Sequence, residues 1–312
     1  VGQLKFAATL QDLRTVLVLR RQLAMELPRT RPWIRERSHG RLPVWHRGVR
    51  GVLRWPVARI ARMVALGVVA GVSMRGVADG TLPLVFVAGL ALYVAGLDAV
   101  ESMAQEADHP GRSEGLPRPI GDLLVRHLGV GAAVMTGVAT IAAGVALALD
   151  PSVDALAMAG IAVPPAALGA AAGAALSVLQ GIQEPSTTNW ELSAPEVAGI
   201  RTVFRVVGPP LVAVIGCLPV VLARSAVEGG GDADPFASAA AGGLGALVVV
   251  ALCGGWIHQR EAIKAWFAQL QEDAGMAGAR PATADHSPRP APRASGRKPT
   301  PTKVTTTLPR KR

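Results

Sequence analysis

Charged and aromatic residues are scarce in this sequence of 312 residues. Only 17% of the residues are charged, against about 25% in a typical soluble domain, and aromatic residues make up 4%. Small and aliphatic residues therefore supply almost all of the apolar half of the composition. Glycine and alanine let membrane helices approach one another closely, so this composition argues against a soluble protein and favours a bundle of membrane helices.

The motifs of several enzyme classes are also missing. The sequence has no P-loop, no His-Glu-x-x-His zinc motif and no nucleophile elbow. Its two cysteines, Cys217 and Cys253, lie in apolar runs and have neither disulfide nor zinc spacing. We therefore expect this chain not to hydrolyse ATP by the P-loop route, and we expect no catalytic residue, metal or cofactor within it.

Six stretches are long and apolar enough to cross a bilayer, which takes about 20 mostly hydrophobic residues. The first is the weakest, because Arg59 and Arg62 lie at its start, where long basic side chains can reach the bilayer surface. The sequence predicts an all-α polytopic membrane helical bundle with about six transmembrane helices. The predicted spans are 56–74, 81–100, 129–149, 156–179, 206–223 and 236–256.

The basic residues are unevenly divided between the two sides of such a bundle. If both termini are cytoplasmic, 30 of the 32 lysines and arginines lie on the cytoplasmic side, and only Arg75 and Arg224 lie outside. Cytoplasmic segments of membrane proteins are enriched in Lys and Arg, so we predict this orientation. The spans then form three hairpins, with short outer connections at 75–80, 150–154 and 224–235.

The remaining segments flank or connect these spans. The tail has nine basic residues against one acidic residue and is predicted to be disordered. Arginines before the first span are expected to meet lipid headgroups, so membrane lipids are expected partners, and no specific nucleic acid is expected. The predicted regions are a basic cytoplasmic or interfacial region at 1–55, the six-span domain at 56–256 with cytoplasmic loops at 101–128 and 180–205, a cytoplasmic helix at 257–276 and the tail at 277–312.

One acidic segment, "DAVESMAQEADHP", follows the second predicted span directly. On a helix that continues from that span, five of its side chains share an arc of about 100°, namely Asp98, Glu101, Gln105, Asp108 and His109. Such a cluster could hold a divalent cation or supply acid and base groups to a membrane enzyme of lipid or cell-wall metabolism. Its position just past a span favours a polar cytoplasmic helix that packs against a partner.

Proline pairs interrupt two of the predicted spans. Proline removes an intrahelical hydrogen bond, so Pro164 with Pro165 and Pro209 with Pro210 are predicted to break or kink their helices, as is Pro219. Broken helices in transporters can mark the moving parts, and the two pairs are candidate gating positions. No acidic or basic residue lies deep in the six spans, which argues against a transporter driven by its own ion gradient.

The segment "LDAVESMAQEADHPGRSEGLPRPIGDLLVRHL" (97–128) resembles the intracellular loop of permease subunits of ABC-type exporters from high-GC bacteria. The upstream "DLRTVLVLRRQLAMELPRTRPW" (12–33) is similar to the cytoplasmic segment that precedes the spans of that family. Those permeases are often longer, with an additional membrane half before this region. The resemblance therefore covers their C-terminal portion.

The resemblance implies an integral membrane permease in the bacterial inner membrane, working as a homo- or heterodimer. A separate P-loop ATPase subunit, which would bind ATP and Mg²⁺, would dock on the cytoplasmic loops and move the spans. A membrane enzyme and a non-transporting scaffold with a partner-binding tail stay open as alternatives. The docking candidates are Glu101, Gln105, Glu106, Asp108, His109, Arg118 and Arg126, with 183–200 as a second surface.

Overall fold

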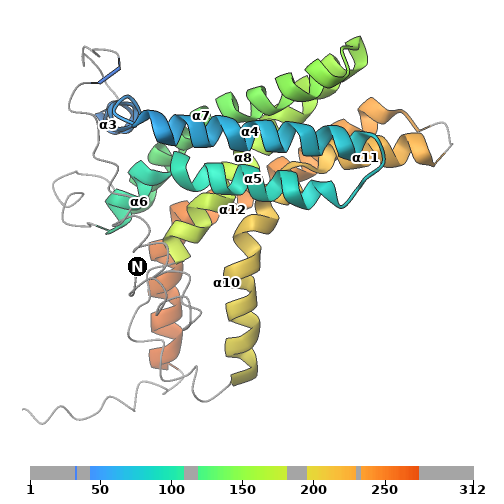
Figure 1. Ribbon diagram of the computed structural model, residues 1–312. Coiled ribbons are helices and arrows are strands. Elements are labelled where there is room, and N and C mark those ends of the chain that lie inside the picture. The colour runs from blue at the N-terminus through green and yellow to red at the C-terminus, as the bar shows by residue number, and fades with distance from the viewer. Residues whose placement is uncertain (1–31, 34–42, 109–118, 181–194, 230–232, 274–312) are drawn as a thin grey trace, which may run out of the picture. The chain divides into compact units, whose positions relative to one another are not determined.

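The computed structural model describes residues 32–33, 43–108, 119–180, 195–229 and 233–273, and no strand occurs among them. Long apolar runs form helices in a membrane because a helix satisfies its backbone hydrogen bonds internally. Figure 1 shows these helices: α3 (Pro43–Val52), α4 (Val57–Ala78), α5 (Leu84–Ala99), α6 (Glu101–Asp108), α7 (Ile120–Leu149), α8 (Val153–Gln180), α10 (Pro195–Gly216), α11 (Leu218–Glu228) and α12 (Pro235–Asp273).

Four of these helices, α4, α7, α8 and α12, are each long and apolar enough to cross a membrane. Two further pairs pass the same criterion together, α5 with α6 and α10 with α11, although they bend by 56° and 58°. The described chain therefore contains four to six candidate spans. The prediction of an all-α multi-pass membrane protein is confirmed, and each of the six predicted runs coincides with a helix or a bent pair.

Several boundaries differ from those expected from the sequence. A helix, α3, lies within the predicted basic region 1–55, and α7 begins at Ile120, within the predicted loop 101–128. Likewise α10 begins at Pro195, within the predicted loop 180–205. The predicted sixth span and cytoplasmic helix form one helix, α12, because nothing between Trp256 and Asp273 ends it. At 1.5 Å per residue its 39 residues measure about 58 Å, roughly twice the hydrocarbon core.

Contacts between helix ends establish the up-and-down order of the bundle. Arg62 near the start of α4 pairs with Asp98 near the end of α5, whereas Arg75 near the end of α4 pairs with Asp150 after α7. The turn at Gly80 lies beside Arg224 of α11. All three predicted outer connections therefore meet at one end of the bundle. We call it the outer end, and we call the opposite end, with α3, α6 and Arg62, the inner end.

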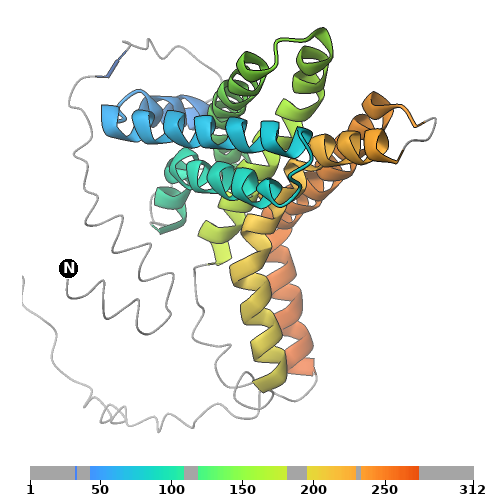
Figure 2. The same cartoon turned by 45° about the vertical axis from the view of Figure 1, so that its right-hand side comes forward.

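The interior of the bundle is built mainly from small residues, where α5 packs against both α4 and α8 (Figures 1 and 2). Twelve of the twenty buried residues of the main core cluster are alanine. Larger apolar side chains of α4, including Val64, Val68 and Val72, point outward and are 39 to 51% exposed. Close backbone packing inside and aliphatic side chains outside are what a bundle surrounded by lipid requires.

Two glycine pairs lie at close contacts between helices. A Cβ on Gly67 of α4 would lie 3.2 Å from the backbone oxygen of Val138, and Gly71 faces the backbone of Ala142 in the same way. Gly169 and Gly173 of α8 similarly face the backbone of α10. Both small-x-x-x-small pairs therefore let neighbouring helices pack closely.

The chain divides into two units, Val1–Lys264 and Ala265–Arg312. The bundle belongs to the first unit. In the second, the described residues continue the α12 helix, and Trp266 contacts Phe267 edge to face with ring centroids 4.9 Å apart. The predicted basic tail, 277–312, lies outside the described residues, as do residues 1–31 and 34–42 of the predicted basic region.

Cysteine labelling tests which end of the bundle faces the cytoplasm. In a background without Cys217 and Cys253, Val153→Cys places a thiol at the outer end on a residue that is 83% exposed, and Gln105→Cys places one on an exposed inner-end residue. In intact cells, a membrane-impermeant maleimide should label only Val153→Cys. Labelling of Gln105→Cys before permeabilisation would contradict the predicted orientation.

Candidate functional site

The short helix α6 is held firmly at the inner end of the bundle. The chain bends at Val100, and Val100, Met103 and Ala104 are completely buried. Val100 and Met103 pack with Leu124 of α7 and Leu179 of α8. These contacts show that α6 is an integral part of the bundle and not a free extension of α5.

A polar junction joins α3, α6 and α7 beside this apolar contact. Arg47 of α3 donates to Glu106 Oε1 of α6, and His127 Nε2 of α7 lies 3.8 Å from the same oxygen. The side chains of Glu106 and His127 are only 10% and 3% exposed, whereas that of Arg47 is 56% exposed. One buried carboxylate thus faces a basic group from each of two neighbouring helices.

Some buried polar atoms near this junction have no hydrogen-bond partner in the protein. They include Glu106 Oε2, His127 Nδ1 and Ser102 Oγ. Ser102 and Glu106 are four residues apart and share one face of α6. Buried polar atoms are costly when unpaired, so this junction has hydrogen-bonding capacity that the described protein does not use.

A bidentate ion pair ties α4 to the end of α5. Arg62 Nε and Nη2 donate to the two carboxylate oxygens of Asp98, both at 2.8 Å. The Asp98 side chain is 13% exposed and that of Arg62 is 33% exposed. Two parallel charge-assisted hydrogen bonds fix the relative position of the two helices more strongly than a single contact would.

The structure does not support the shared arc predicted for the acidic segment. The 56° bend at Val100 places Asp98 on α5 and Glu101 and Gln105 on α6, and Asp98 is engaged by Arg62. The helical arc was a poor guide because it assumed one straight helix. In the part of the chain that the structure describes, no three His, Cys, Asp or Glu side chains could hold a metal ion together.

The docking candidates fall into three groups. Glu101 and Gln105 lie on the outward side of α6, where Gln105 is exposed and donates to Glu101 at 3.3 Å. Glu106 instead points into the polar junction, and Arg126 pairs with Asp122 one turn earlier on α7. His109 and Arg118 lie outside the described residues, as do 183–194, and for Asp108 only its place in α6 is described.

The predicted gating prolines lie inside continuous helices. Pro164 and Pro165 are internal to α8, and Pro209 and Pro210 are internal to α10. Neither pair ends its helix, so the helices are not broken at these positions, whereas the predicted kinks and gating role stay predictions. The break in the fifth span lies at Cys217, directly before the helix that has Pro219 in its first turn. This agrees with the preference of proline for the start of a helix, where its missing N–H costs nothing.

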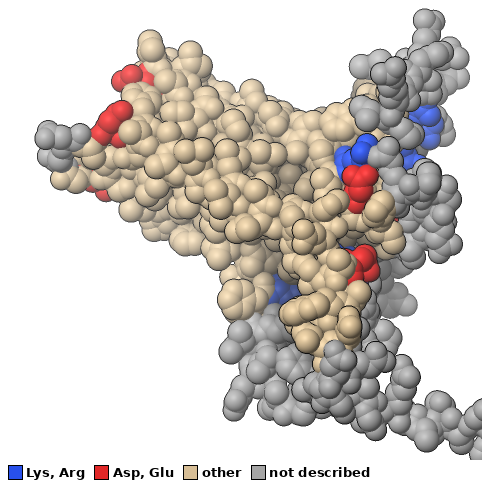
Figure 3. All heavy atoms as spheres, turned by 180° about the vertical axis from the view of Figure 1, so that it is seen from behind, with Lys and Arg blue, Asp and Glu red and all other residues tan. Residues whose placement is uncertain are grey.

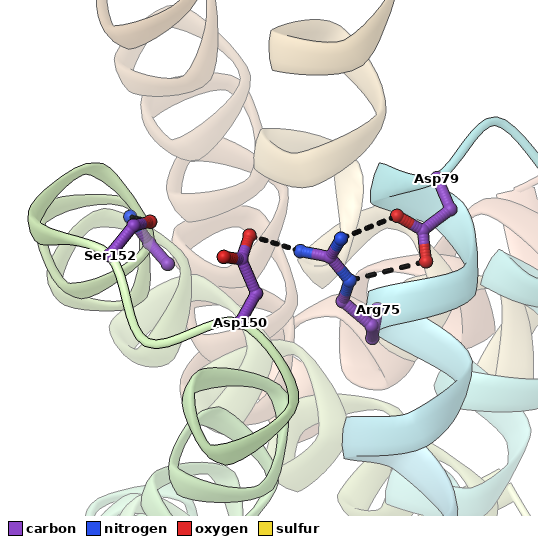
Figure 4. Close-up of polar contacts among 5 residues, drawn as sticks. Arg75, Asp79, Asp150 and Ser152 are labelled. Atoms are coloured by element: carbon purple, nitrogen blue, oxygen red, sulfur yellow. Dashed lines mark hydrogen bonds and ion pairs between the residues drawn. The ribbon is translucent and has the colours of Figure 1, made fainter.

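A second ion-pair cluster closes the outer end (Figure 4). Arg75 donates through Nε and Nη2 to Asp79 at 3.2 and 2.6 Å, and through Nη1 to Asp150. Asp79 caps the end of α4 and Asp150 the end of α7, so one guanidinium connects the two helices. Gly80 follows with φ +105°, a left-handed conformation that suits glycine and lets the chain turn tightly into α5.

Charge is confined to the two ends on the face of the bundle seen in Figure 3. That face is tan across its middle, with acidic side chains at one end and basic and acidic side chains towards the other.

The basic partners Arg47, Arg62 and His127 were not identified from the sequence as members of a site. Their only signal was a position near or before the start of a span, which many structural residues share.

Comparisons with known proteins do not narrow the function further. No protein-family model, no curated protein and no solved structure matches this chain.

Proposed function

We propose that this chain is the permease component of an ABC-type export system in the bacterial inner membrane. The observation that carries the proposal is α6, a short helix seated rigidly across the inner end and bent by 56° from the span before it. Force applied to such a helix reaches α3, α5, α7 and α8, because it contacts all four. The resemblance of residues 97–128 to exporter permeases concerns this same segment.

The positions of the charged side chains favour a source of energy outside this chain. The described ion pairs lie at the two ends, and the spans have no acidic or basic residue at their centres that could relay protons or bind a coupling ion. In this proposal the chain has no catalytic residue of its own. A separate subunit with a P-loop binds ATP and Mg²⁺, and its closure moves the spans by rigid-body shifts.

Within this proposal, the contacts of the described side chains bear on which of them would dock the ATPase. Glu106 is engaged with Arg47 and Asp98 with Arg62, so both serve the internal architecture. Glu101 and Gln105 present polar groups on the outward side of α6. We therefore assign docking to Glu101 and Gln105, and not to Glu106.

Co-purification tests this assignment. The tagged full-length chain, isolated from its host in mild detergent, should retain a P-loop ATPase. Glu101→Lys with Gln105→Lys should weaken this association by about tenfold or more, because one reversed and one added charge at an interface cost on the order of a kcal/mol or more. Asp154→Lys, at the exposed outer end of α8, is the matched control and should change nothing.

One result would count against the permease function, and another would count against α6 as its docking helix. If no ATPase co-purifies with the unmodified chain, the proposed permease function is contradicted, because it requires a separate ATPase subunit. If the ATPase binds the double variant as tightly as the unmodified chain, the permease function stands but α6 is not its docking helix.

A further inference from the structure

The helix α3 lies at the inner end, packed against the first turns of α7. A Cβ on Gly48 would lie 2.9 Å from Val130 Cγ2, and a Cβ on Gly129 would lie 3.2 Å from the ring of Trp45. In Figure 1, α3 is seen nearly end-on while α4 is seen from the side. The helix therefore runs across the direction in which α4 spans, as a helix in the plane of a membrane surface would.

The side of α3 away from this contact is basic. His46, Arg47 and Arg50 share an arc of about 100° at 3.6 residues per turn, and Arg54 follows the helix closely. No aspartate or glutamate occurs anywhere between residues 37 and 78. We call His46, Arg47, Arg50 and Arg54 the basic α3 face. Within this face, Arg47 also pairs with Glu106 of the neighbouring helix α6.

The basic α3 face is exposed beside the start of α4. Arg50 and Arg54 are exposed, and the Arg47 side chain is 56% exposed even though it contacts Glu106. Trp45, on the adjoining side, is 37% exposed and also lies against Gly129. Tryptophan and arginine at the end of a span are typical of the boundary between hydrocarbon and headgroups.

The apolar surface next to this face continues onto α4. Val57, Ile60 and Val64 are 61, 39 and 39% exposed, and they lie on a helix that is apolar enough to span a membrane. The apolar side of α3 is covered by α7, and its basic side adjoins the outward-facing apolar surface of α4. Such an amphipathic helix is suited to lie at a charged bilayer surface.

We propose that the basic α3 face binds the phosphate headgroups of anionic phospholipids in the leaflet at the inner end. Charge complementarity selects this ligand: clustered guanidinium groups, uninterrupted by acidic residues in their own segment, match the phosphodiester groups of an anionic leaflet. Each arginine near such a surface strengthens the attraction by about fivefold. The binding is independent of what the chain transports and of any ATPase.

The test uses the full chain reconstituted into phosphatidylcholine vesicles. A trace of spin-labelled phosphatidylglycerol or spin-labelled phosphatidylcholine is added, and electron paramagnetic resonance measures the relative association of the two lipids with the protein. The unmodified chain should prefer phosphatidylglycerol, and the preference should decrease in high salt because it is electrostatic.

Arg50→Gln with Arg54→Gln should lower the preference for phosphatidylglycerol by about a factor of two or more, averaged over all lipids at the protein surface. Arg50→Lys with Arg54→Lys should retain the preference, and this variant also shows that the position tolerates substitution. Arg224→Gln, at the outer end, is the matched control and should leave the preference in place.

Three results would overturn the proposal. One is an unchanged preference for phosphatidylglycerol in the glutamine double variant. That result would mean that the basic α3 face binds an acidic protein segment and not lipid. Another is an equal loss in Arg224→Gln. The third is loss of the preference in the lysine variant, which keeps the charge.

Discussion

Replacing Gly96 with leucine is expected to lower the free energy of unfolding by about 3 kcal/mol. Gly96 of α5 faces α8, where a Cβ would lie 2.7 Å from the backbone oxygen of Ala170 and 3.1 Å from Ala174 Cβ. The obstructing oxygen belongs to the backbone of a helix, so it cannot move aside as a flexible side chain would. A leucine there must push α5 and α8 apart along their shared core.

The same substitution at Gly137 provides the control. Gly137 lies on α7, and a Cβ there meets nothing within 4 Å. Leucine at this exposed position should change stability by less than about 0.5 kcal/mol. The measurement is thermal unfolding of the purified full chain in detergent, followed by tryptophan fluorescence. If both variants unfold at the same temperature as the unmodified chain, the close packing of α5 on α8 is wrong.

Asp98→Asn is expected to cost about 2 to 3 kcal/mol of stability, near the lower end of the range for breaking a buried ion pair. The substitution weakens the bidentate contact that Arg62 makes with both carboxylate oxygens, while the charged guanidinium stays only 33% exposed. Asp98 is itself 13% exposed, so water compensates little for the lost interaction.

The outer-end pair Arg75–Asp79 is the matched comparison. Asp79 is 53% exposed, and Asp79→Asn should cost less than about 1 kcal/mol, as for most exposed ion pairs. A double variant, Arg62→Gln with Asp98→Asn, should lose less than the sum of its single variants because both remove one interaction. Additive losses in the same unfolding experiment would show that the two side chains do not stabilise the bundle as a pair.

The sequence was a good guide to which residues form membrane helices. Hydropathy is a property of a stretch of about 20 residues, and so is the requirement that such a stretch satisfy its own backbone hydrogen bonds. The run at 156–179 illustrates this, because it became the single helix α8, Val153–Gln180, despite its two prolines. The short connections predicted between the runs likewise lie together at the outer end.

The acidic segment shows where the sequence stopped being a sufficient guide. Its position after a span correctly indicated a helix at the inner end, but the bend at Val100 decided which side chains share a surface. Burial of Met103 among Leu124 and Leu179 explains why α6 turns onto the bundle and does not continue the line of α5. Those contacts come from segments far along the chain, and no local pattern reveals them.

The partners of the charged side chains were also decided only by the tertiary structure. Arg62 and Asp98 are 36 residues apart, Arg47 and Glu106 are 59 apart, and Arg75 and Asp150 are 75 apart. The sequence by itself determined an all-helical membrane bundle with three outer turns and charge kept to its ends, because helix formation and membrane insertion depend on local composition. The tertiary structure decided which charge meets which and which face of α6 stays outward, because ion pairing depends on distances between helices that only packing sets.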